Sequence, residues 1–250
     1  MSLHYYADLT WEEMRDLLGG EVVAILPVGA LEAHGPHLPL ATDVIIAEAM
    51  AGAGARLVAA AGKQVVVLPA LPYTAAPFAE GFSGTVSLPR ATIARLVADL
   101  AAELARQGVS CLALANAHLD PTHLGALADA ADLVRAAGTP RMVHPDLTRK
   151  PWAGRLTEEF KSGACHAGQY ETSVVMAARP ELVRDELRSA LPDNPRSLSR
   201  AIAEGHRTFE AAGGPEAYFG YPGTATAEEG RATIEVLGQI LAEAILTDVT

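Results

Sequence analysis

Residues 22–43 read VVAILPVGALEAHGPHLPLATD, an apolar run that passes directly into a cluster of acidic and histidine residues. The run Val22–Val28 is rich in β-branched residues and ends at a glycine, which is typical of a short buried strand. Glu32 and His34 are two positions apart, so in an extended chain their side chains point the same way. Gly35-Pro36 predicts a turn that presents both side chains beyond the carboxyl edge of a sheet.

Asp43 follows His34 by nine residues, at the expected start of a helix. Two carboxylates and an imidazole from a strand end, a loop and a helix start form a ligand set suited to zinc, manganese or iron(II). Each residue alone has an ordinary explanation, because Glu32 and His34 could be solvated in a polar loop and Asp43 could cap its helix. The metal interpretation therefore depends on further candidate ligands elsewhere in the chain.

The composition favours one α/β domain, spanning 1–250, that acts on a small molecule. Half of the 250 residues are hydrophobic but only 5% are aromatic, which favours layered packing. The net charge of -11 argues against nucleic acid or an anionic membrane surface as a partner, because both need a basic surface. Cys111 and Cys165 lack the spacing of a disulfide framework, and Met1–Arg15 is polar. We therefore expect a cytoplasmic protein with no signal peptide and no membrane span.

Strands and helices are predicted to alternate along the chain. Strands are predicted over 22–28, 64–69, 109–115 and 141–144. Helices are predicted over 10–18, 43–61, 89–107, 121–137, 197–212 and 227–246, and a further helix ends before Pro180. The segments 147–164 and 182–195 are predicted to be irregular. This alternation predicts a mainly parallel sheet with helices on both faces, because parallel neighbours need crossover connections. The long irregular connection 72–89, which contains Tyr73 and Glu80, is a candidate functional loop.

Further candidate ligands lie at the ends of other predicted elements. His118 and Asp120 directly follow the strand 109–115, and this strand is expected to end at the same rim of the sheet as 22–28. Glu171 lies in the first turn of a predicted helix, where the helix dipole alone could explain an acidic residue. His166 precedes it in a loop of small residues. Together the candidates are seven side chains: Glu32, His34, Asp43, His118, Asp120, His166 and Glu171. Two metal ions bridged by a carboxylate would use all seven, and would generate hydroxide from a bridging water at neutral pH.

Several stretches together resemble the creatininase family of metal-dependent amidohydrolases. They are Glu32–Asp43, Phe82-Ser83-Gly84-Thr85, Asn116-Ala117-His118, His166-Ala167-Gly168 with Glu171-Thr172-Ser173, and Gly220-Tyr221-Pro222 with Ala225-Thr226 and Glu229-Gly230. The resemblance runs from about residue 20 to 235. It implies a three-layer αβα sandwich, a binuclear metal centre and a cytoplasmic homo-oligomer, often a hexamer.

The resemblance also implies roles for individual residues. By position, the expected metal ligands are Glu32, His34, Asp43, His118 and Glu171. Asp43 is expected to bridge two divalent ions. The expected ions are zinc and/or manganese, and iron is a further possibility. His166 matches the acid/base that handles the proton on the leaving nitrogen, a role that suits an imidazole near neutral pH. His37 and His123 are expected to support the ligands or to lie at the surface.

The third of these stretches departs from the family pattern. The family often has Asn-Gly-His-Gly-Gly-Asn where this chain has Asn116-Ala117-His118-Leu119-Asp120-Pro121. Creatininase itself carries a carboxylate two residues after that histidine, so Asp120 is a candidate for a further metal ligand. Ser162 stands where creatininase uses a tryptophan at the substrate, which argues against creatinine itself. The candidate substrate-binding residues are Trp152, Tyr73 and Glu80.

The sequence thus predicts a metal-dependent hydrolase that cleaves a non-peptide C–N bond, in a cyclic or linear amide, of a small polar molecule. Two alternatives stay open. One is a formamide deformylase or a peptidase acting on a short modified peptide. The other is a degenerate, non-catalytic family member that binds a small ligand.

Overall fold

The centre of the molecule is a five-stranded sheet in which all neighbouring strands run parallel. The computed structural model describes residues 3–138 and 140–247. The strand order is β1-β3-β2-β4-β5, with β1 (Leu3–Tyr5), β2 (Val22–Val28), β3 (Gln64–Val67), β4 (Val109–Asn116) and β5 (Arg141–Val143). The predicted parallel sheet is confirmed. The sequence missed β1, because a strand of three residues is too short to show a periodic pattern.

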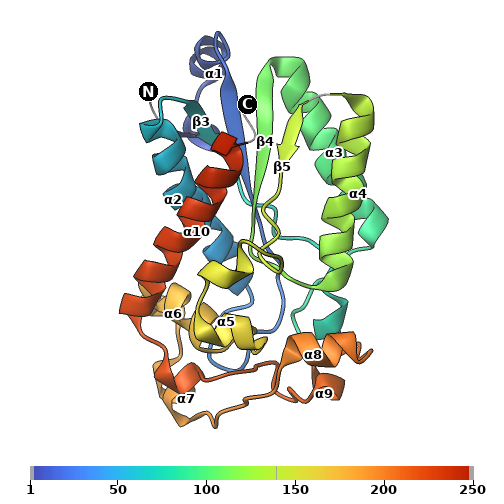
Figure 1. Ribbon diagram of the computed structural model, residues 1–250, viewed down its shortest axis with the longest axis vertical. Helices are drawn as coiled ribbons and strands as arrows, with labels where there is room; N and C mark the ends of the chain where they lie inside the picture. Colours follow the sequence, from blue (N-terminus) through green and yellow to red (C-terminus); the bar gives the residue numbers. More distant parts are fainter. Residues whose placement is uncertain (1–2, 139, 248–250) are drawn as a thin grey trace.

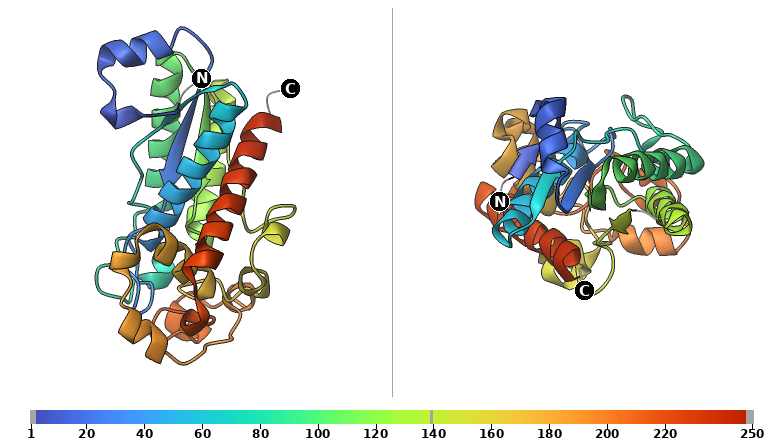
Figure 2. Two further views of the ribbon diagram at one scale, coloured as in Figure 1. Left: turned by 90° about the vertical axis from the view of Figure 1, so that its left-hand side faces the viewer. Right: turned by 90° about the horizontal axis from the view of Figure 1, so that it is seen from above.

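Helices cover both faces of the sheet (Figures 1 and 2). One face carries α2 (Thr42–Ala60), α6 (Gln169–Ala178) and α10 (Ala227–Thr247), and the other carries α1 (Trp11–Leu17), α3 (Arg90–Gln107) and α4 (Pro121–Ala137). Successive residues of β2 point into opposite layers: Val23 and Ile25 pack under α2 and α10, whereas Val22 and Ala24 pack under α3 and α4. The chain is therefore a three-layer α/β sandwich, as expected.

The helix boundaries follow from local signals in the sequence. Thr10 and Glu13 form the reciprocal hydrogen bonds of a capping box at the start of α1. Gly108 ends α3 in the left-handed conformation, with a φ of 108°. Pro121 occupies the first turn of α4, where its missing N–H costs nothing.

The C-terminal half departs from the prediction. The continuous helix predicted over 197–212 is wrong: α8 (Leu198–Ala203) and α9 (Phe209–Ala212) are separate, because the chain turns at Gly205 with a φ of 96°. The segments predicted as irregular contain α5 (Glu158–Ser162) and α7 (Asp185–Ala190), which are too short to show helical periodicity. Short 3-10 helices occur at Tyr6–Asp8, Pro77–Ala79, Ala153–Arg155, Pro180–Leu182 and Pro222–Thr224.

The carboxyl edge of the sheet positions the candidate site. β2 and β4 are neighbours with Val28 opposite Asn116, so the chain leaves both strands at the same edge. Figure 1 shows α5 to α9 gathered at this lower end of the molecule. Among the helices of residues 3–138 and 140–247, none combines the length and apolar character needed to cross a membrane.

Candidate metal centre

Five acidic and histidine side chains converge in the interior at the carboxyl edge of the sheet. They are Glu32, His34, Asp43, His118 and Glu171, and each is 3% exposed or less. The first two follow β2, His118 follows β4, and the other two lie in the first turns of α2 and α6. The structure thus brings together five of the six candidate ligands that the sequence suggested.

Asp43 lies between two histidines. Its Oδ1 is 3.3 Å from His34 Nε2, and its Oδ2 is 2.9 Å from His118 Nδ1. Glu171 Oε2 adds a donor 3.5 Å from His34 Nε2, and Glu32 Oε1 adds one 3.3 Å from His118 Nδ1. The donor atoms therefore form two groups of three, each within 4.8 Å, that share Asp43. Such spacing is suited to divalent cations with nitrogen and oxygen ligands.

Hydrogen bonds to backbone carbonyls determine which ring nitrogen of each histidine faces the cluster. His34 Nδ1 lies 3.1 Å from the carbonyl oxygen of Glu32, and His118 Nε2 lies 2.8 Å from that of Ala75. A carbonyl only accepts hydrogen bonds, so these two nitrogens carry the protons. In the neutral imidazoles the opposite nitrogens, which face Asp43, are therefore free to bind a metal.

His37 and His123 are buried and support the cluster from outside. His123 Nε2 is 3.0 Å from Asn116 Oδ1, while the Asn116 amide donates to the carbonyl of His118 at 2.8 Å. His37 Nε2 is 2.9 Å from the hydroxyl of Thr172, next to Glu171 in α6. Both histidines thus lie in the supporting position that the sequence suggested for them, rather than at the surface.

The donor atoms of the cluster fit a metal because several have no other partner. Glu32 Oε2, His34 Nε2 and Asp43 Oδ2 are buried and make no hydrogen bond outside the cluster. Burying an unpaired polar atom costs on the order of 1–3 kcal/mol, more for a charged group. Cations held between these atoms would satisfy all three at once.

The electrostatics of the cluster favour bound positive charge. Burial raises the pKa of Glu32, and it raises the pKa of Glu171 to about 8. Burial alone would lower the pKa of His34, but the carboxylates of Asp43, Glu171 and Glu32 outweigh it and raise this pKa to about 10. The protein therefore retains protons here when no metal competes for the same atoms.

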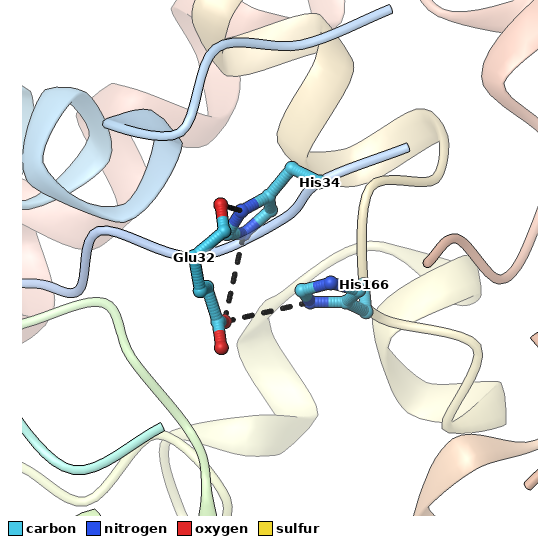
Figure 3. A group of neighbouring side chains, drawn as sticks. All are labelled: Glu32, His34 and His166. Carbon is cyan, nitrogen blue, oxygen red and sulfur yellow. Dashed lines mark hydrogen bonds and ion pairs between the residues drawn. The ribbon is translucent and has the colours of Figure 1, made fainter. Parts of the chain in front are cut away.

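His166 lies at the edge of the cluster (Figure 3). Its Nδ1 is 3.9 Å from Glu32 Oε1, and its Nε2–H donates a hydrogen bond of 2.9 Å to the carbonyl oxygen of Ala33. Burial and the nearby His34 keep the pKa of His166 well below its usual value. The ring is thus neutral, with the lone pair of Nδ1 facing the cluster. Glu32, His34 and His166 also form a third group of potential metal donors.

Asp120 is not in any of the donor groups found among the described residues. Its Oδ1 accepts a hydrogen bond from the N–H of Thr122 at 2.7 Å, which caps α4, and its Oδ2 accepts one from the N–H of Phe78 at 3.3 Å. Backbone donors therefore occupy both oxygens. The structure brings Asp120 to the wall of the adjacent cavity instead of among the ligands.

A cavity of about 550 Å³ opens beside the cluster, and Glu32, Asp43, His118, His166 and Glu171 form one side of it. The described residues that line this cavity do not include the three candidate substrate-binding residues, Trp152, Tyr73 and Glu80. Tyr73 and Glu80 are exposed on the surface. Trp152 packs against the core on the α2 side, with the guanidinium of Arg155 5.9 Å from its ring.

The sequence did not predict that two further residues, Phe209 and Glu159, belong to the site. Phe209 of α9 packs on the His166 ring, with centroids 4.2 Å apart. Glu159 of α5 is buried and accepts hydrogen bonds from the N–H groups of Gln169, Tyr170 and Tyr221, which joins the start of α6 to the loop before the last helix. Nothing in the sequence distinguishes Glu159 from its exposed neighbour Glu158, because the contacts come from distant segments.

Comparison with known proteins identifies the family of this chain. The family described as "Creatininase: Creatinine amidohydrolase" matches residues 7–245. A mycofactocin precursor peptide peptidase of Mycolicibacterium smegmatis is 33% identical over 210 residues, covering 83% of this chain and 78% of the relative. The creatinine amidohydrolase of Pseudomonas putida is 30% identical over 199 residues, covering 72% and 73%. A solved structure named "Creatininase Mn" superimposes with a TM-score of 0.76 at 28% identity and covers 99% of both chains. The chain therefore belongs to the creatininase family of amidohydrolases.

Proposed function

We propose that this protein is a metal-dependent hydrolase with a binuclear centre, which cleaves a C–N bond other than a peptide bond in a small molecule. The position of Asp43, with one oxygen toward His34 and the other toward His118, is the observation that supports two ions. His34 and Glu171 would hold one ion and Glu32 and His118 the other, with Asp43 shared. The mixed nitrogen and oxygen donors suit zinc and/or manganese, with iron possible.

The chain's own residues would orient the substrate and handle its protons. When bound, two divalent ions supply Lewis acidity, which polarises an amide carbonyl and makes water nucleophilic at neutral pH. His166 would hold the proton destined for the leaving nitrogen at Nδ1, because its Nε2–H is committed to the carbonyl of Ala33. In this proposal Asp120 caps α4 and shapes the cavity wall.

A peptidase acting on a short modified peptide is the second candidate. The peptidase relative is 33% identical over 83% of this chain and supports this second candidate. The creatinine amidohydrolase relative supports the first candidate to a similar degree. A degenerate, non-catalytic binding protein is less well supported. All five clustered side chains belong to donor groups whose atoms lie within 4.8 Å of one another, so the expected ligand set is retained.

The test is elemental analysis of the purified protein, followed by a hydrolysis panel on the same preparation. The panel contains lactams, linear amides, formamides and short peptides. We expect about two divalent ions per chain, and turnover of an amide or lactam that is lost on treatment with a chelator. Active protein without metal would refute the proposal, and turnover of the peptides alone would favour the second candidate.

We also propose that residues 1–250 form one domain that works in the cytoplasm as a homo-oligomer, with a hexamer favoured. Residues 1–2, 139 and 248–250 lie outside the described residues. Reduced thiols at Cys111 and Cys165 and exposed aromatic side chains, such as Trp11 at 73%, support this proposal. Light scattering on the eluted protein should give the mass of six chains, and the mass of one chain would refute the assembly.

A further inference from the structure

Two of the three lysines in the chain line the cavity beside the metal cluster. Lys150 precedes the 3-10 helix Ala153–Arg155 and Lys161 lies in α5. Both are exposed residues that also line the cavity, so they lie at its opening. The third, Lys63, pairs with Glu21 at 3.1 Å and does not line this cavity. In a protein of net charge -11, these lysines place two cationic groups at the cavity opening, one of which, Lys161, pairs with Glu158.

Apart from the side formed by the metal cluster, the interior of the same cavity has an apolar wall. It is formed by Phe78, Phe160, Phe209, Leu198, Ile202 and Leu124. The ring centroid of Phe209 lies 6.0 Å from that of Phe78 and 4.2 Å from that of His166. An apolar group against Phe209 would therefore lie next to the candidate acid/base.

The cavity has the volume of a site for a ligand larger than a single small ring. Its volume of about 550 Å³ lies within the range of roughly 300–1,000 Å³ that is usual for pockets of drug-sized ligands. A ligand that fills it would contact three different regions: the metal cluster, the apolar wall and the lysines at the opening.

We propose that the substrate is an amide that carries both an aromatic or branched apolar group and a carboxylate. The apolar group lies against Phe78 and Phe209, and the carboxylate lies at the opening near Lys150 and Lys161. This inference rests on the proposed function and specifies the substrate class for the same site. An N-acyl amino acid has this chemistry.

The lysines and the wall should contribute separately to affinity. Lys161 already pairs with Glu158, whose side chain is 92% exposed, so a bound carboxylate would exchange one exposed partner for another. Exposed ion pairs contribute up to about 1 kcal/mol each, and the exchange at Lys161 adds little, so the two lysines together should favour an anion by about fivefold. Burying a phenyl group should contribute about a hundredfold.

The test is calorimetric binding of three probes to the metal-loaded protein. 3-Phenylpropanoate has both groups, 3-phenylpropan-1-ol lacks the charge, and acetate lacks the apolar group. The proteins are the wild type, the double variant Lys150→Met with Lys161→Met, and Lys63→Met as the matched control. A carboxylate that binds the metal instead of the lysines would bind the wild type and the double variant equally.

We expect the wild type and Lys63→Met to bind 3-phenylpropanoate about fivefold more tightly than the alcohol and about a hundredfold more tightly than acetate. In the double variant the preference over the alcohol should fall to about twofold or less, while the preference over acetate is retained. An unchanged preference over the alcohol would overturn the role of the lysines, and equal affinity for acetate would overturn that of the wall. Absence of 3-phenylpropanoate binding to the wild type would overturn both.

The outcome of this experiment is separable from that of the proposed function. Probe binding reports on the wall and the lysines, whereas the metal content and the hydrolysis panel report on the reaction. A protein with two ions and amide turnover but no lysine-dependent preference would refute the substrate class alone. A protein with that preference and no turnover would refute the proposed reaction alone.

Discussion

Replacing Asp43 with asparagine should release both ions, whereas replacing Glu171 with glutamine should release only one. Asp43 belongs to both donor groups built on His34 and His118, while Glu171 belongs only to the group with His34. Both substitutions conserve side-chain volume and remove one negative charge. Any difference between them therefore reports on the number of ions that each carboxylate serves.

The expected magnitude follows from linkage between metal binding and folding. An ion present at a hundred times its dissociation constant stabilises the folded state by about 2.7 kcal/mol. For a chain of this size each kcal/mol shifts the melting temperature by roughly 2–4 °C. Glu171→Gln should therefore lose about 5–11 °C of metal-dependent stabilisation, and Asp43→Asn should lose roughly twice as much.

The assay combines metal stoichiometry by mass spectrometry with thermal unfolding, before and after treatment with a chelator. Asp129→Asn is the matched control, because Asp129 is exposed, pairs with Arg90 and belongs to none of the donor groups found among the described residues. The control should keep both ions and its full metal-dependent shift. If Asp43→Asn retains one ion, or if both test variants lose the same amount of metal, Asp43 is not a bridge.

Three further results are expected. His166→Ala should keep its metal but lose on the order of a hundredfold to ten-thousandfold in turnover; a lower metal content would instead identify His166 as a ligand. Metal-free protein should lose on the order of 4 kcal/mol of unfolding free energy between pH 7 and 9, because the folded state, with the pKa of His34 raised to about 10 and that of Glu171 to about 8, binds more protons than the unfolded chain. Urea unfolding at the two pH values measures this change, and greater stability at pH 9 would contradict it. Gly230→Ala should destabilise the fold by about 1–3 kcal/mol, because the added Cβ would lie 1.8 Å from the carbonyl oxygen of Ser173. Gly223→Ala, with nothing within 4 Å of its added Cβ, should melt at the wild-type temperature.

Much of the fold and most of the metal cluster could be predicted from local features of the sequence. The apolar run Val22–Val28, the spacing of Glu32 and His34, and the helix start at Asp43 are patterns within a few residues of one another. The parallel topology then requires strand ends to meet at one edge, which brings His118 to the same place as Glu32. The sequence therefore determined the layers of the fold and which side chains gather at the carboxyl edge.

The tertiary structure decided what surrounds that cluster. Asp120 caps α4 and meets the N–H of Phe78, 42 residues away, so its oxygens are not among the donor groups. The turn at Gly205 separates α8 from α9 and brings Phe209 onto His166. Lys150 reaches the cavity from a loop, and Lys161 reaches it from the short helix α5. Periodicity and capping act within a few residues, whereas the cavity wall depends on packing between segments far apart in the chain, which no local pattern encodes.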